Sequence, residues 1–304
     1  MLPLPSSYAR LHEHALFQFD ALCTIRGRLR TAHRQALDGA AHALRPGSME
    51  PAIPPRRLLY LDFSGCEPLA AIAVGDLDTA THVTWQLSGT GIRARNALWG
   101  SAREAGELYL EQRKVGIDAP AVVAWLGYRS PNLGTALLNA SARRGVKVLS
   151  RDLEIFAALR GDQPHLALEA HSYAASMAAQ ALDARADFAH RVDALVTIGS
   201  AGFPSYLTKD IGRVGVPAEH LYTAIASQDS LARWGRLLSG RKHLAAQCFA
   251  VTAREDLGLA GVSGHNTSQF IAGDPHSLHG YRDPGTTSLR NIALITTGQI
   301  PLGP

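Results

Sequence analysis

The sequence predicts an α/β protein in which a mostly parallel central sheet has helices on both faces and follows a helical N-terminal extension. Three observations support this fold class. From about residue 57 onward, short apolar runs alternate with segments of helical period. Two or three of these runs follow one another before the alternation begins. The 304 residues also suffice to bury one large core.

The segment before residue 45 is the expected N-terminal extension. Its apolar residues recur at intervals of three, four and seven, which predicts an amphipathic helix or a pair of helices with Ser6 or Ser7 as the N-cap. The proline- and glycine-rich stretch 45–57 breaks this period. We therefore expect a helical extension and linker over residues 1–57 and an α/β domain over residues 58–304.

The order of the remaining elements predicts the geometry of the sheet. Apolar runs predict strands at 57–63, 68–75, 82–89, 120–128, 165–170, 194–202 and 220–226. Helical periodicity predicts helices at 94–116, 133–145, 150–160, 173–185 and 285–297. Consecutive strands without a helix between them favour antiparallel pairing, whereas alternation with helices favours parallel pairing. The sheet should therefore begin antiparallel and continue parallel.

Composition argues against several classes of protein. The 30 Lys and Arg against 26 Asp and Glu give a net charge of +4 without a long run of either sign, too weak and dispersed to indicate a nucleic-acid partner. No signal peptide is evident, and no window approaches the roughly 18 apolar residues of a membrane span. The widely spaced Cys23, Cys66 and Cys248 are expected to be reduced, half-buried thiols. We expect a cytoplasmic protein without integral membrane association; non-classical secretion and the oligomeric state stay open.

The stretch AHSYA at residues 170–174 follows an apolar strand and precedes an alanine-rich helix. A nucleophilic serine on such a strand-to-helix turn needs small residues two positions before and two after it, so that the backbones can approach. Ala170 and Ala174 fill these positions, where glycine is usual. The same pattern also fits a serine that only caps a helix. Ser172 is therefore a candidate nucleophile, and the pentapeptide alone does not decide its role.

An acid and then a histidine follow in the order that a nucleophile elbow requires. Asp229 comes just after the predicted strand 220–226. Acids at the ends of parallel strands gather at the edge of the sheet where the elbow lies. Asp229 also suits the N-cap of the helix that begins SLARWG, a role compatible with the first.

Four stretches resemble the actinobacterial α/β-hydrolase family formerly described as DUF1023. They are HVTWQLSGTG at 82–91, AWLGYRSP at 124–131, AHSYAAS at 170–176 and GYRDPGTTSLRNIALITTG at 280–298. Together with VTIGSAG and the Asp229 segment, they span the chain from about residue 57 to its end. The resemblance implies an α/β-hydrolase fold with a triad of Ser172, Asp229 and a C-terminal histidine.

Three histidines are candidates for the base of this triad. His279 directly precedes GYRDPGT, which corresponds to the family segment after its histidine, and we favour it. His276 would take the role if the loop carries a short insertion, and His265 comes third. His171, beside the serine, is expected to pack or to contact substrate.

The resemblance also implies an oxyanion loop in SGTG, residues 88–91, where Ser88 replaces the proline usual in the family. The backbone N–H of Tyr173 and one from Thr90 or Gly91 would stabilise a tetrahedral oxyanion. Without the resemblance, SGTG is equally consistent with a glycine turn after a strand.

Glu169 departs from the pattern, because it puts a carboxylate where the central strand should be apolar. An isolated buried carboxylate is costly, so Glu169 should be protonated or paired. Arg93 and Arg95 are possible partners. We place Glu169 and His171 beside the substrate pocket.

These roles predict a serine hydrolase that cleaves a small-molecule or lipid-like carboxylic ester through an acyl-enzyme. No metal or organic cofactor is required, and the sequence has no HExxH motif, P-loop or dinucleotide fingerprint. One alternative is a thioesterase or acyltransferase on the same triad. Another is a catalytically silent α/β-hydrolase-fold binding module, favoured by the alanine-flanked elbow and Glu169. Apolar residues of the late loops could line the pocket: Trp234, Phe249, Leu257 and Leu259.

Overall fold

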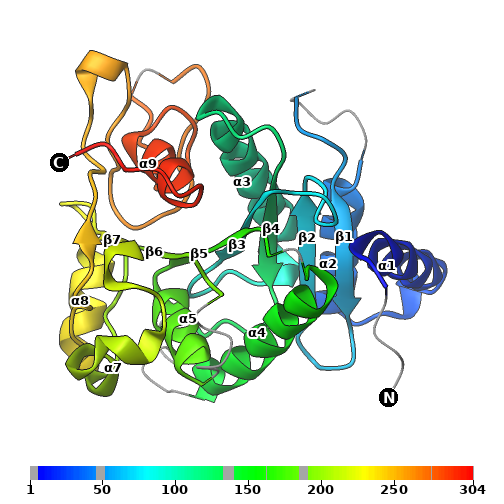
Figure 1. Ribbon diagram of the computed structural model, residues 1–304. Coiled ribbons are helices and arrows are strands. Elements are labelled where there is room, and N and C mark those ends of the chain that lie inside the picture. The colour runs from blue at the N-terminus through cyan, green and yellow to red at the C-terminus, as the bar shows by residue number, and fades with distance from the viewer. Residues whose placement is uncertain are drawn as a thin grey trace.

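The computed structural model describes residues 6–45, 52–132, 140–161, 163–184, 191–274 and 276–303. These residues form one eight-stranded sheet in the order β1-β2-β4-β3-β5-β6-β7-β8, with helices on both faces (Figure 1). The strands are β1 (Arg57–Asp62), β2 (Leu69–Val74), β3 (His82–Leu87), β4 (Pro120–Leu126), β5 (His165–His171), β6 (Ala194–Ile198), β7 (Leu221–Ala224) and β8 (Gln247–Cys248).

The sheet begins antiparallel and continues parallel, as the sequence predicts. β2 pairs antiparallel with β1 and β4, and the remaining neighbours pair parallel. The central strands β4 and β6 are buried along their whole length, which is why their sequences are near-continuous apolar runs. The predicted fold class is confirmed. The short edge strand β8 is not among the predicted strands, because its two residues are exposed and carry no apolar pattern.

Helices α3 (Ala94–Lys114) and α9 (Thr287–Ile295) cover one face of the sheet, and α4 (Ala140–Leu159) and α5 (Tyr173–Asp183) cover the other (Figure 1). The described part of the two predicted helices 133–145 and 150–160 is one continuous helix, α4, and residues 133–139 lie outside the described residues. Gly145 inside α4 marks a close approach rather than a break, because a Cβ there would collide with Met177 of α5.

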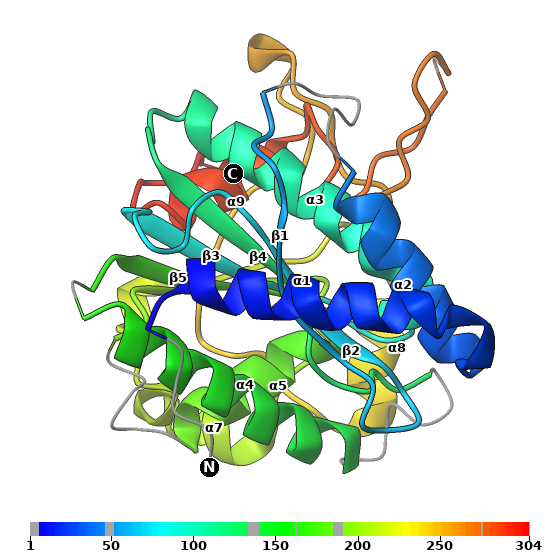
Figure 2. The same cartoon turned by 90° about the vertical axis from the view of Figure 1, so that its right-hand side faces the viewer.

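The N-terminal extension is the predicted helical pair. α1 (Tyr8–Thr24) begins after Ser7, whose side chain accepts from the Arg10 N–H, and α2 (Thr31–Ala43) follows a short 3-10 turn, η1 (Arg26–Arg28). α1 packs on β1 and α2 packs on α3, as Figure 2 shows. Residues of both helices share one apolar cluster with the sheet and α3: Ala15, Leu37 and Ala40 with Leu58, Ile72 and Leu98. The extension therefore contributes to the core of the α/β domain.

The three cysteines are exposed, and the described helices are not of the membrane-spanning kind. Cys23, Cys66 and Cys248 are free but exposed, so the prediction of half-burial is wrong. Among the described helices, none combines the length and apolarity that crossing a membrane requires.

Candidate active site

Ser172 occupies a strained turn between β5 and α5. Its backbone has φ 55° and ψ −121°, and Ser172 and Gln163 are the two non-glycine residues with positive φ in the described part of the chain. A serine held in this sparsely populated region projects its hydroxyl from the tip of the turn, as in a nucleophile elbow. The flanking Ala170 and Ala174 are fully buried, so alanine fits where the backbones approach most closely.

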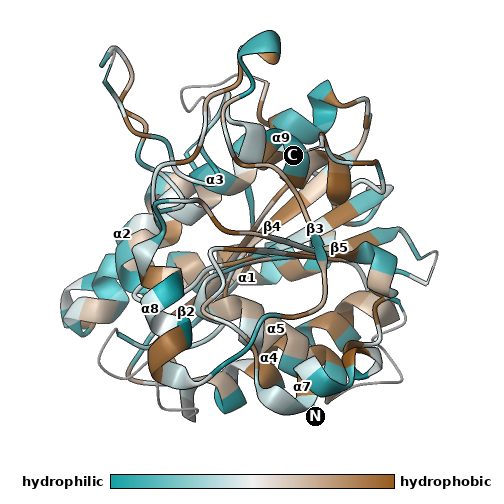
Figure 3. Cartoon of the chain, turned by 90° about the vertical axis from the view of Figure 1, so that its left-hand side faces the viewer, coloured by the Kyte–Doolittle hydropathy of each residue, from teal (hydrophilic) through white to brown (hydrophobic). Residues whose placement is uncertain are grey.

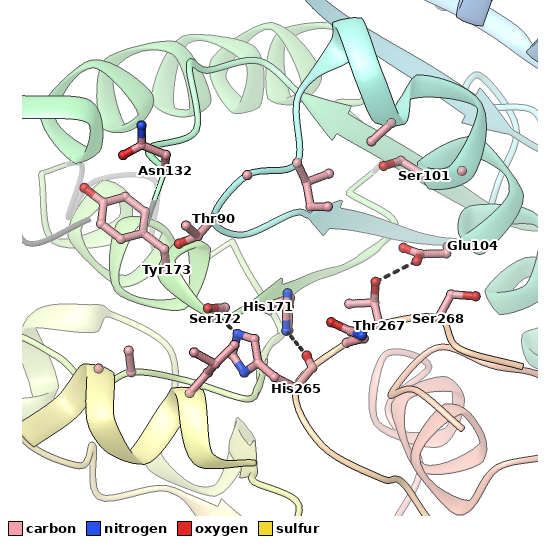
Figure 4. Close-up of a pocket in the computed structure, with 18 of the residues that line it drawn as sticks. Thr90, Ser101, Glu104, Asn132, His171, Ser172, Tyr173, His265, Thr267 and Ser268 are labelled. Carbon is pink, nitrogen blue, oxygen red and sulfur yellow. Dashed lines mark hydrogen bonds between the residues drawn. The ribbon is translucent and has the colours of Figure 1, made fainter. Parts of the chain in front are cut away.

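A continuous hydrogen-bond chain joins Ser172, His265 and Asp229. The Ser172 Oγ lies 2.9 Å from His265 Nε2, and His265 Nδ1 lies 2.8 and 2.9 Å from the two carboxylate oxygens of Asp229 (Figure 4). Because an ionised carboxylate only accepts, His265 Nδ1 carries the proton and Nε2 is free to accept from the serine hydroxyl. The arrangement therefore gives the tautomer that a general base needs.

Asp229 is fully buried and held by three donors. In addition to His265 Nδ1–H, its oxygens accept from the Ala232 N–H at 2.9 Å and the Tyr281 hydroxyl at 3.0 Å. Asp229 is also the N-cap of α8 (Ser230–Ser239), so both roles expected from its position are present in the geometry. The Tyr281 hydroxyl accepts from the Ala226 N–H at 2.7 Å, and burial beside Asp229 raises its pKa. The hydroxyl is therefore a protonated, fixed donor to the carboxylate.

The structure corrects the choice of histidine. His279 stacks on Phe270 with ring centroids 5.2 Å apart, and its backbone carbonyl accepts from the Ser263 N–H. His276 is exposed. Residues 269–274 and 276–279, together called the excursion 269–279, leave the site, and Asp283 joins its two ends: the Asp283 Oδ2 accepts from the N–H groups of Gln269, Phe270 and Gly280.

The excursion carries both favoured histidines away from Ser172 and leaves His265, the third choice, in place before it. The sequence order of serine, acid and histidine is satisfied by all three histidines. It therefore offers no signal that separates them.

His171 contacts the backbone of His265. Its Nε2 lies 2.8 Å from the His265 backbone carbonyl. A carbonyl only accepts, so Nε2 is protonated and Nδ1 is not. Burial and the neighbouring His265 hold the pKa of His171 well below its usual range, so the ring stays neutral. His171 also lines the cavity in front of Ser172, in keeping with its expected place beside the substrate pocket.

Glu169 is paired with Arg282, and the expected partners Arg93 and Arg95 instead contact Glu67. The Arg282 guanidinium donates to Glu169 at 2.7 Å and to Glu104 of α3 at 2.8 Å. Both side chains of the Glu169 pair are fully buried. Burial raises the pKa of Glu169, an effect that Arg282 opposes.

This buried network reaches the loop that carries His265. Glu104 accepts from the Thr267 hydroxyl at 2.7 Å (Figure 4), two residues after His265. Glu169, Glu104 and Arg282 thus link β5, α3 and the His265 loop. Sequence reasoning missed Arg282 and Tyr281, although both lie in the stretch GYRDPG that carried the family resemblance.

The glycine loop before α3 lies directly against Ser172. A Cβ at Gly89 would stand 2.8 Å from both the His171 carbonyl oxygen and the Ser172 Cβ, so only glycine fits there. The Gly91 N–H donates to the Pro131 carbonyl at 2.8 Å, which corrects its proposed place in the oxyanion hole. Of the two N–H groups expected to pair with that of Tyr173, which begins α5, this leaves Thr90 as the candidate. Thr90 and Tyr173 lie next to each other on one side of Ser172 in Figure 4.

A cavity of about 1210 Å³ opens over Ser172 and His265. One wall is α8, which contributes Leu231, Trp234 and Leu238. Across the cavity from α8 lie the polar side chains of Glu104, Thr267 and Ser268 (Figure 4).

Trp234 therefore lines the cavity as expected. Phe249 instead packs in the apolar cluster beneath α9, and Leu257 and Leu259 are not among the lining residues. Within the described ranges, no three His, Cys, Asp or Glu side chains are grouped to hold a metal ion.

The sheet order and the serine elbow define an α/β-hydrolase fold. The model of the alpha/beta hydrolase family matches residues 66–238, more than half of the chain, and the chain belongs to this family.

Uncharacterized proteins of Mycobacterium tuberculosis and Mycobacterium bovis are 31% identical over 193 residues, which cover 60% of this chain and 70% of theirs. A second uncharacterized M. tuberculosis protein is 27% identical over 250 residues, 75% of this chain and 37% of its own.

Two solved structures extend this comparison. A hyperthermophilic esterase from the archaeon Pyrobaculum calidifontis has a TM-score of 0.46 and 13% identity, covering 91% of this chain and 93% of its own. Esterase LipW from Mycobacterium marinum has a TM-score of 0.39 and 16% identity, covering 76% and 80%.

Proposed function

We propose that this α/β hydrolase is a serine hydrolase that cleaves a carboxylic ester, with Ser172 as nucleophile, His265 as base and Asp229 as the acid that orients it. The observation that carries the proposal is the unbroken hydrogen-bond chain from the strained Ser172 through His265 to the buried Asp229. The large cavity over Ser172 gives an ester room to bind.

The geometry supports a two-step reaction. His265 Nε2 takes the Ser172 proton as Oγ attacks the ester carbonyl carbon, and the N–H groups of Tyr173 and Thr90 stabilise the oxyanion. His265 then gives this proton to the departing alkoxide, which leaves an acyl-serine. Water, deprotonated by His265, attacks the acyl carbon, and the carboxylic acid leaves as Ser172 is reprotonated.

Hydrolysis of a short-to-long series of p-nitrophenyl esters by wild type and Ser172→Ala tests the proposal, with circular dichroism confirming that both fold. We expect the alanine variant to lose at least about 10⁴-fold in kcat, and a fluorophosphonate probe to label wild type at Ser172 only. Equal turnover by both proteins, or a folded wild type that neither hydrolyses these esters nor reacts with the probe, would overturn it.

The same acyl-enzyme could pass its acyl group to an acceptor other than water, or form from a thioester. Product analysis with added alcohol or thiol separates these reactions from ester hydrolysis. The pairing of Glu169 with Arg282 removes one of the two observations that favour a silent binding module.

A further inference from the structure

Helix α8 turns its large apolar side chains away from the protein. It packs inward through small residues: Ala232 is buried, and a Cβ at Gly235 would lie 3.0 Å from Ala201. Its large apolar residues are 45 to 69% exposed: Leu231, Trp234, Leu237 and Leu238. Clustered exposure of this kind marks an interaction surface, and here it borders the mouth of the cavity over Ser172.

A second apolar group lies on the excursion 269–279. Phe270, Ile271 and Leu278 are 39, 63 and 56% exposed. The excursion, the orange double segment at the upper right of Figure 2, projects on the same side of the molecule as α8, and Figure 3 shows the same relation from the opposite side. Residues 265–268, which lead into it, line the cavity together with α8. Two apolar projections therefore flank one opening.

The charged side chains of the segment that contains α8 are all positive. Residues 230–243 contain four Arg and Lys side chains and no Asp or Glu, whereas the whole chain has a net charge of only +4. Arg233 and Lys242 are exposed, next to the apolar stripe. A short helix that combines Trp and Leu with flanking cations has the composition of an element that lies in the interface of an anionic membrane.

We propose that α8 and the excursion 269–279 dock the mouth of the cavity on an anionic lipid surface. Leu237 and Ile271 would insert among the acyl chains, and Arg233 and Lys242 would contact the anionic headgroups. This inference rests on the proposed function and names its substrate class as a membrane-borne ester with a long acyl chain. The ester would pass from the lipid along Leu231, Trp234 and Leu238 to Ser172.

Co-sedimentation of the full-length Ser172→Ala variant with vesicles tests this proposal without any turnover. The vesicles contain equal parts of phosphatidylcholine and phosphatidylglycerol, and pure phosphatidylcholine vesicles are the comparison. We expect binding to the mixed vesicles and much weaker binding to the neutral ones. In this background Arg233→Ser/Lys242→Ser should weaken binding about 25-fold, or about fivefold per cation removed. Leu237→Ser/Ile271→Ser should weaken it at least about tenfold.

Arg10→Ser/Lys114→Ser is the matched control. It removes the same charge from exposed positions on α1 and at the end of α3, and binding should stay unchanged. The proposal is overturned if Ser172→Ala stays in the supernatant with mixed vesicles, or if the control pair weakens binding as much as Arg233→Ser/Lys242→Ser. A dimer in sedimentation velocity that Leu237→Ser dissociates would assign the surface to a second copy of the chain. Vesicle binding by a protein that hydrolyses no ester would overturn the proposed function alone.

Discussion

The two sides of the candidate active site differ in whether their side chains have partners within the protein. We call the buried side behind Ser172 the inner wall and the exposed side formed by α8 the outer wall. Behind Ser172, the buried carboxylates of Asp229 and Glu169 have fixed donors in Tyr281 and Arg282. In front of it, Trp234 and the leucines of α8 are 45 to 69% exposed. A buried charge needs a partner within the chain, because burying an unpaired charge is costly. An exposed apolar side chain has no such requirement and is available to bind a partner from outside the protein.

The sharpest test of the inner wall is His265→Ala against His279→Ala. Loss of the His265 ring removes the acceptor of the Ser172 proton, and kcat/KM for a p-nitrophenyl ester should fall about 10⁴-fold. His279→Ala should leave kcat/KM unchanged, because its ring stacks on Phe270 outside the hydrogen-bond chain. The opposite pattern would return His279 to the role of base.

Arg282→Met tests whether the inner wall depends on its buried cation. The change leaves Glu169 and Glu104 buried without their partner, and the free energy of unfolding should drop by about 3–5 kcal/mol in urea denaturation. Arg254→Met is the matched control, because Arg254 pairs with Asp256 on the surface. The free energy of unfolding of this variant should hardly differ from that of wild type. Equal effects of the two changes would contradict a special role for the buried network.

The neutral His171 predicts a pH dependence of stability. Its pKa is lowered by folding, so below about pH 6.5 the unfolded chain binds a proton that the folded chain does not, and stability falls as the pH falls. From pH 7 to pH 5 this loss should amount to about 2 kcal/mol.

His171→Gln keeps a donor for the His265 carbonyl and removes the titrating ring, so urea denaturation should show a smaller loss of stability in the variant over this range. If wild type and variant lose the same stability, His171 is protonated in the folded protein.

Tyr281→Phe should have the smallest effect. It removes one donor from Asp229 while keeping the packing, and kcat should fall roughly tenfold, the effect of losing one hydrogen bond to a charged group. KM should stay constant, because Tyr281 is fully buried behind Asp229 and does not line the cavity. Steady-state kinetics would contradict this role if KM rose while kcat stayed the same.

Much of the fold was readable from the sequence because its signals are local. The strand runs and the helical period predict the sheet that begins antiparallel and continues parallel. The small residues around Ser172, between an apolar strand and an alanine-rich helix, made it a candidate for the elbow, and the place of Asp229 after β7 predicts an acid at the same edge of the sheet. Each depends on residues close together in the chain, where backbone preference and hydrophobic period act directly.

The partners across the site were decided by the tertiary structure. The sequence alone determined that a serine, an acid and a histidine follow in order along an α/β chain, but among the three histidines it favoured His279 and placed His265 third. Only the folded chain brings His265, 93 residues after Ser172, to its hydroxyl and sends His279 outward on the excursion closed by Asp283. It also joins Arg282 to Glu169 across 113 residues. Such long-range pairs form when buried polar groups must find partners in three dimensions, and spacing along a single sequence carries no record of which partner they find.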